Sequence, residues 1–217
     1  MAEKNKRDGG TLSSSVSRRT FLKTLGGGAA AAAIPGAALA APIRRARGDE
    51  ARVLGPGKAK FVLEVNGQKK EVEAEPRLTL LDVLRNHLDL TGAKNICDMG
   101  ECGGCTVLID DVPLYSCLTL ALDARGRKIT TVEGLETDRL NPTQMAFVKH
   151  DAFQCGFCTP GWIMSVEALR RKGGQPDDET IREALTGNLC RCSAYPKILE
   201  AARAVAGKGG GDAKKHY

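Results

Sequence analysis

Between residues 59 and 134, apolar and polar positions alternate in short runs, which predicts strands. The predicted strands cover 61–65, 69–74, 106–110, 113–117 and 129–133. Asn66-Gly67 is a strong hairpin signal, and Asp110-Asp111 predicts a second turn. Residues 80–88 have helical spacing, and Thr79 in front of them is a suitable N-cap. Two strands, a helix and further strands predict a mixed sheet with one helix across it.

From residue 142 onward the apolar positions recur with helical spacing, which predicts four helices. The predicted helices cover 142–153, 159–172, 177–187 and 195–207. Pro142, Pro160 and Pro196 stand in the first turns, where the missing N–H of proline costs no hydrogen bond. Gly173-Gly174 is a stop signal after the second helix. The chain is therefore predicted to be α+β, with a mixed-sheet domain followed by an all-α, four-helix domain.

Composition narrows the classes of function. The 217 residues are 42% hydrophobic and only 4% aromatic, enough for packed cores that are poor in rings. Residues 1–40 carry six Lys/Arg against two Asp/Glu, a surplus of four, which leaves 26 against 24 in the rest of the chain. Because the chain after residue 40 is nearly balanced in charge, we expect no nucleic-acid partner.

The beginning of the chain resembles a twin-arginine export signal. Ser17-Arg18-Arg19-Thr20-Phe21-Leu22-Lys23 carries the motif, and a weakly apolar run rich in Gly and Ala follows it. Ala38-Leu39-Ala40 fits the small-x-small cleavage pattern, so we expect cleavage after Ala40. The alternative is a membrane span, but the run contains Pro35 and is shorter than the roughly 20 apolar residues needed. The resemblance implies export of the folded protein to the periplasm.

Eight cysteines carry the candidate chemistry, in two sets of four. Cys97, Cys102, Cys105 and the later Cys117 follow the C-x4-C-x2-C…C spacing typical of plant-type ferredoxins, in which four thiolates hold a [2Fe–2S] cluster. The glycines between them, at 100, 103 and 104, allow a tight wrap. A zinc site and a disulfide knot are the alternatives, but zinc motifs usually show two separated C-x-x-C or C-x-x-H pairs.

The second set of cysteines falls in the two turns of the predicted helical domain. Cys155 and Cys158 stand between the first and second helices, and Cys190 and Cys192 stand between the third and fourth. Two helical hairpins with two thiols at each tip can meet around one metal centre. Spacing alone permits zinc there as well as a second cluster.

At these residues the sequence resembles the xanthine oxidase/aldehyde oxidoreductase family of molybdenum hydroxylases. Gln154-Cys155-Gly156-Phe157-Cys158-Thr159-Pro160-Gly161 and Gly187-Asn188-Leu189-Cys190-Arg191-Cys192 are similar to its second signature. The set from Cys97 to Cys117 is similar to its first, and the resemblance covers about residues 60–206. It implies a β-grasp ferredoxin-like [2Fe–2S] domain, then a four-helix [2Fe–2S] domain. The periplasmic aldehyde oxidoreductases are the members that share the leader.

The resemblance also implies roles and partners. The chain would be the iron–sulfur subunit of an oxidoreductase, with no catalytic residue of its own, in a heterotrimer. A large subunit would hold molybdenum–molybdopterin, as the cytosine dinucleotide, and Gln154 and Cys192 would contact that cofactor. Electrons would pass through two [2Fe–2S] clusters to FAD in a second partner, or to a cytochrome. The alternative is a free-standing periplasmic [2Fe–2S] carrier.

The predicted organisation has five parts. Residues 1–40 are the signal peptide, 41–58 a flexible linker, 59–134 the ferredoxin domain, 135–207 the helical cluster domain and 208–217 a flexible tail. No stable membrane span is expected.

Overall fold

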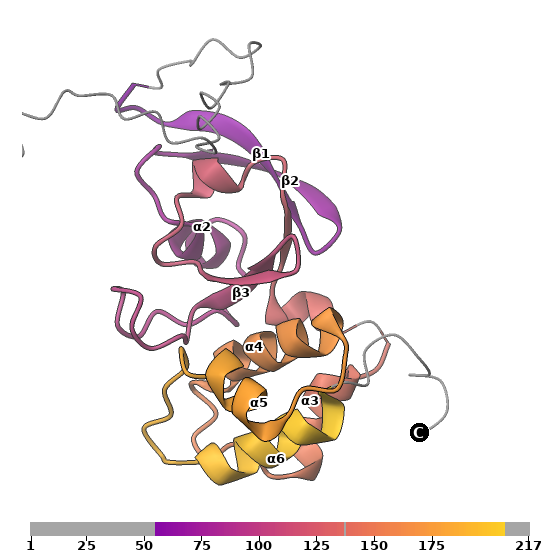
Figure 1. Cartoon of the computed structure of the whole chain (residues 1–217). Coiled ribbons are helices and arrows are strands. Elements are labelled where there is room, and N and C mark those ends of the chain that lie inside the picture. The colour runs from indigo at the N-terminus through magenta and orange to yellow at the C-terminus, as the bar shows by residue number, and fades with distance from the viewer. Residues whose placement is uncertain (1–54, 137, 207–217) are drawn as a thin grey trace, which may run out of the picture. The chain divides into compact units, whose positions relative to one another are not determined.

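The computed structural model describes residues 55–136 and 138–206 (Figure 1). The predicted signal peptide, most of the linker and the tail lie outside these residues. Within them, no helix combines the length and the apolar character that a membrane crossing requires.

A five-stranded mixed sheet forms the first half of the described chain. Its strands are β1 Ala59–Val65, β2 Gln68–Ala74, β3 Thr106–Ile109, β4 Val112–Tyr115 and β5 Lys128–Thr130. The order across the sheet is β2-β1-β5-β3-β4, with β1 and β5 parallel and every other pair antiparallel. Asn66-Gly67 and Asp110-Asp111 all have positive φ, as a two-residue type I′ hairpin requires. Both predicted turns are therefore confirmed.

Helix α2, Leu80–Asn86, packs its apolar face on this sheet. Thr79 caps it in a capping box, because its hydroxyl accepts from the Asp82 N–H while the Asp82 carboxylate accepts from the Thr79 N–H. Leu80, Leu81 and Leu84 are fully buried with the inward residues of β1, β3 and β5. The prediction of a helix across a mixed sheet is confirmed.

Four helices follow, as predicted. They are α3 Pro142–Lys149, α4 Thr159–Lys172, α5 Asp178–Ala184 and α6 Tyr195–Val205. Asn141 and Asp177 cap α3 and α5 with their side chains, and Gly173 at φ 72° ends α4. Two short 3-10 helices, η1 Ala121–Ala124 and η2 Val132–Leu135, complete the elements.

Strand β3 connects the two halves because both of its faces are covered. Val107 and Ile109 point into the core beneath α2, whereas Leu108 packs in the core of the helical half. Helix α4 lies against β3, as Figure 1 shows. All four β3 residues are accordingly buried. This packing brings the beginning of α4 next to the loop that precedes β3.

Three predicted element ends miss by three residues or more. The last strand ends at Thr130 instead of 133, and η2 takes the following residues. Helix α3 ends at Lys149 instead of Phe153, and α5 ends at Ala184 instead of Gly187.

Candidate metal centres

The first set of cysteines gathers at one end of the sheet. The loop between α2 and β3 carries three of them, and Cys117 follows β4. Cys102, Cys105 and Cys117 are buried and Cys97 is half-buried. The thiols lie in two neighbouring pairs, because Cys102 shifts the pKa of Cys97 and Cys105 shifts the pKa of Cys117. All four are free thiols, and their role as cluster ligands stays a prediction.

The loop wraps the thiols with its own backbone. Gly100 and Gly103 have φ of +78° and +69°, in the left-handed region that glycine enters without strain. The N–H of Met99 is directed to the Cys97 sulfur and lowers the pKa of that thiol to about 7. Burial raises the pKa of Cys117 to about 12. One edge of the site therefore favours a thiolate, while its interior excludes water.

The second set of cysteines gathers at the tips of the two helical hairpins. Cys155 and Cys158 precede α4, and Cys190 and Cys192 precede α6. Cys192 affects the pKa of Cys155, and Cys190 affects that of Cys158, so each neighbouring pair takes one thiol from each hairpin. The Phe157 N–H lowers the pKa of Cys155, whereas burial raises the pKa of Cys158 to about 12.

Each donor set has the four thiols that a two-iron cluster takes as ligands. In the described part of the chain, no group of three or more His, Cys, Asp or Glu side chains is placed to hold one metal ion. Each set instead consists of two thiol pairs, and a [2Fe–2S] cluster takes four cysteine thiolates on two irons.

Two buried donors lie beside the second set without a hydrogen-bond partner among the described residues. They are the Thr159 hydroxyl and the Trp162 indole N–H, both in the first turn of α4. Buried polar atoms are normally paired, so an unpaired donor next to Cys158 points to an acceptor that the chain itself does not supply. The sulfurs of a bound cluster would be such acceptors.

The surface around the second set is open and apolar. Gln154 and Cys155 are exposed, and Cys192, a neighbour of Cys155, is half-buried. Phe157 and Leu189 expose 53% and 52% of their surface beside these thiols. Exposed apolar side chains around a candidate site are typical of a face that another surface covers.

Sequence reasoning missed several polar residues that support the thiols. The Tyr195 hydroxyl accepts a hydrogen bond from the Cys190 N–H at 3.0 Å. Asn188 and Ser165 are buried and hydrogen-bonded to each other at 2.7 Å. Asn188 lies within the second signature, but its partner on α4 has no signal in the sequence.

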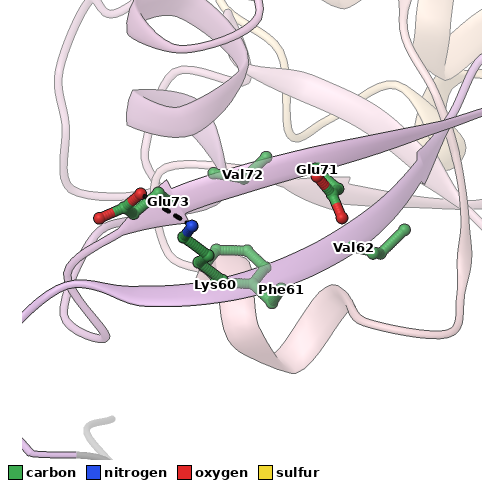
Figure 2. A pocket seen from close by; sticks show the side chains of 6 residues that line it. All are labelled: Lys60, Phe61, Val62, Glu71, Val72 and Glu73. Carbon is green, nitrogen blue, oxygen red and sulfur yellow. Dashed lines mark ion pairs between the residues drawn. The ribbon is translucent and has the colours of Figure 1, made fainter.

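A hollow on the β1–β2 hairpin lies apart from both sets. It encloses about 310 Å³, and Figure 2 shows its lining. The residues are Lys60, Phe61, Val62, Glu71, Val72 and Glu73. Lys60 and Glu73 form an exposed ion pair across the strands at 3.8 Å. None of the predicted site residues lines this hollow.

Comparison with known families agrees with this division into two sites. Residues 63–128 match the 2Fe-2S iron-sulfur cluster binding domain, and residues 131–203 match the [2Fe-2S] binding domain. Residues 15–35 match the twin-arginine translocation pathway signal sequence. Two [2Fe–2S]-binding domains in one chain define an iron–sulfur electron-transfer protein, with an α+β architecture in which a β-grasp domain precedes a helical one.

Individual relatives narrow the family. The aldehyde oxidoreductase iron-sulfur-binding subunit PaoA of Escherichia coli O157:H7 is 42% identical over 211 residues, 89% of this chain and 90% of the relative. One subunit of a probable xanthine dehydrogenase from Bacillus subtilis is 47% identical over 67% of this chain and 84% of the relative. The chain belongs to the iron–sulfur subunits of the xanthine oxidase/aldehyde oxidoreductase family, which are electron-transfer subunits of oxidoreductases.

Solved structures of two oxidoreductases are similar to this chain in fold and in sequence. A crystal structure of quinoline 2-oxidoreductase from Pseudomonas putida 86 matches with a TM-score of 0.66 and 42% identity, over 70% of this chain and 98% of the matched chain. The aldehyde oxidoreductase of Desulfovibrio gigas matches with a TM-score of 0.64 and 36% identity, over 68% of this chain and 17% of that longer chain.

Proposed function

We propose that the chain holds two [2Fe–2S] clusters and relays electrons between them as a subunit of an aldehyde oxidoreductase. Each cluster, when bound, takes up and releases one electron at a time. The proposed ligands are Cys97, Cys102, Cys105 and Cys117 in the ferredoxin domain, and Cys155, Cys158, Cys190 and Cys192 in the helical domain. The observation that carries the proposal is the arrangement of eight free thiols as two double pairs, one in each matched domain.

The proposed electron donor is a large subunit with a molybdenum–molybdopterin cofactor, as the cytosine dinucleotide. Gln154 and Cys192 of this chain would contact that cofactor. Their positions support the proposal, because Gln154 is exposed, Cys192 is half-buried next to Cys155, and Phe157 and Leu189 beside them expose apolar surface. A partner that covers this face would bring its cofactor close to the helical-domain thiols.

The ferredoxin-domain thiols would pass electrons onward, to FAD in a second partner or to a cytochrome. We propose a heterotrimer of this chain with the molybdenum and flavin subunits. The aldehyde substrate and the periplasmic location rest on the match to PaoA along most of the chain and on the export signal. Export of the folded protein allows the thiols to be metallated in the reducing cytoplasm.

The decisive experiment is electron paramagnetic resonance (EPR) of the native complex after reduction with dithionite. We expect two distinct S = 1/2 signals and about four iron atoms per chain, the content of two [2Fe–2S] clusters. A colourless sample with zinc or with oxidised disulfides would overturn the proposal.

The alternative of a free-standing carrier makes a different prediction for the size of the native particle. A carrier elutes alone in gel filtration, whereas the proposed subunit co-elutes with a molybdenum-containing chain. The exposed apolar surface at Phe157 and Leu189 favours membership of a larger complex.

A further inference from the structure

The two candidate cluster loops touch each other directly. The Leu189 N–H donates a hydrogen bond to the carbonyl oxygen of Cys102 at 2.9 Å. Leu189 immediately precedes Cys190, and Cys102 belongs to the other thiol set. The route from one proposed ligand to the other therefore consists of the backbone of Leu189 and a single hydrogen bond.

A buried side chain fixes this contact. Asn188 is only 4% exposed, and its Nδ2 donates to the carbonyl oxygen of Gly103 at 3.0 Å. Its Oδ1 accepts from the Ser165 hydroxyl at 2.7 Å. Ser165 is itself buried in α4, so the side-chain amide is held from both ends. Asn188 thus links the helical domain to the residue that follows Cys102.

The backbones approach so closely that side chains are excluded between them. A Cβ on Gly161, in the first turn of α4, would lie 2.2 Å from the Gly103 carbonyl oxygen. A Cβ on Gly103 would lie 2.5 Å from the Gly187 carbonyl oxygen. Tyr115 adds a third bond across the junction, because its hydroxyl donates to that same Gly187 oxygen at 2.9 Å.

We propose that Asn188, held by Ser165, is a positioning residue that keeps the Cys102–Leu189 contact between the two cluster loops closed and so sets the rate at which an electron passes between the clusters along this path. One electron passes from the Cys190 side to the Cys102 side. The helical-domain centre is oxidised by one electron and the ferredoxin-domain centre is reduced by one, with no bond broken and no proton transferred. The inference rests on the proposed function, since it requires both clusters.

The contact could instead serve only to dock the two domains. Docking has other supports, however, such as the ion pair between Arg171 on α4 and Asp111 in the β3–β4 turn. A docking role predicts that loss of Asn188 changes stability alone. An electron path predicts that loss of Asn188 also changes the dipolar splitting between the two centres and the rate at which an electron redistributes between them.

The test uses the natively purified complex with Asn188→Ala, and with Ser165→Ala as the second variant if the first loses iron. Thr186→Val is the matched control, because its exposed hydroxyl bonds only to the Glu183 carbonyl within its own turn. In Gly161→Ala the added methyl group should push the backbone of Gly103 away from α4. Iron content and dithionite-reduced EPR are recorded first, followed by the dipolar splitting between the reduced centres.

The electron path itself is followed by rapid freeze-quench EPR after a light pulse on deazaflavin has delivered one electron per complex. We expect both signals to persist in Asn188→Ala and Gly161→Ala, with a smaller dipolar splitting. Redistribution of the electron should slow several-fold, because electron transfer weakens when a hydrogen bond in its path is replaced by a longer gap through space. Thr186→Val should match wild type.

Two results distinguish a failure of the proposed function from a failure of the proposed path. If wild type shows no pair of cluster signals, the proposed function fails and the path fails with it. If both signals persist but splitting and redistribution in Asn188→Ala and Gly161→Ala equal those of wild type, only the path is overturned.

Discussion

At the scale of single residues, the eight thiols differ in their surroundings although all eight are proposed ligands. Backbone N–H groups favour the thiolate at Cys97 and Cys155 and lower the pKa of both thiols. Burial disfavours it at Cys117 and Cys158. Each site thus combines an outer thiol that ionises readily with an inner thiol that needs a metal to ionise.

The division into two sets predicts selective losses. Cys102→Ala should remove only the ferredoxin-domain EPR signal, and Cys190→Ala only the helical-domain signal, each with about half the iron. The reason is that the pairs join thiols within a set and not between sets. Iron analysis and EPR of the two variants check this. If both variants lost the same EPR signal, the assignment of the ligands to two separate sets would be contradicted.

Thr159 predicts a shift in reduction potential. Its buried hydroxyl lacks a partner among the described residues and follows Cys158 directly. A hydrogen bond to the cluster stabilises its more negative, reduced form, so Thr159→Val should lower the helical-domain potential. A net bond of about 1 kcal/mol corresponds to roughly 40 mV for one electron. EPR-monitored redox titration measures the shift, and the ferredoxin-domain potential is the internal control. An unchanged potential would place this hydroxyl away from the cluster.

At the scale of elements, local signals in the sequence predicted where helices begin better than where they end. Thr79, Asn141 and Asp177 are caps that accept from the backbone N–H three residues ahead, so the signal and its effect are adjacent. The end of α3 was missed because Asp151, and not a glycine, takes the left-handed position at φ 48°. The Ala152 N–H then bonds the Phe147 carbonyl, which completes a Schellman motif.

The last strand was predicted too long for a tertiary reason. The Thr131 N–H donates to the side chain of Asn66, at the tip of the β1–β2 hairpin, and not to a neighbouring strand. The ladder therefore stops at Thr130. The contact of Leu189 with Cys102 could not be predicted from the sequence for the same reason. Cysteine spacing predicts which residues belong to each proposed site, but contacts between distant segments decide how the two sets of cysteines meet.

Helix α4 carries a buried charge that predicts acid sensitivity. Glu167 is 1% exposed and accepts hydrogen bonds from Arg170, Arg171 and Thr143. Burial opposes its ionisation, but these bonds outweigh burial, so the pKa of Glu167 is lowered. A lowered folded-state pKa contributes stability above the ordinary value of about 4.3, and this contribution is lost as pH falls through the folded value.

Glu167→Ala should therefore destabilise the protein by about 3 kcal/mol at pH 7, because two arginines lose their buried partner. Its unfolding free energy should also depend less on pH below about 4.3 than that of wild type. Urea unfolding followed by circular dichroism at several pH values measures both effects. Glu183→Ala, at an exposed position of α5, is the control. Equal pH profiles for Glu167→Ala and wild type would refute the assignment.

At the scale of the whole molecule, export and metal loading constrain each other. Eight thiols that reached an oxidising compartment without metal would form disulfides, so we expect the proposed clusters to be inserted, and the protein to fold, before export. The twin-arginine signal at residues 15–35 suits that order of events. The double variant Arg18→Lys/Arg19→Lys should leave the protein in the cytoplasm with its leader attached and with both EPR signals intact.

Exchanging the leader for one that exports unfolded chains tests the same constraint from the other side. The protein should then reach the periplasm without iron, and thiol titration should show oxidised cysteines, because disulfide formation there competes with metal binding. Cell fractionation, iron analysis and mass spectrometry of each fraction measure these outcomes. Full iron content in the chain exported unfolded would show that the clusters are inserted after export. In that case the thiols would not require a leader that exports the protein already folded.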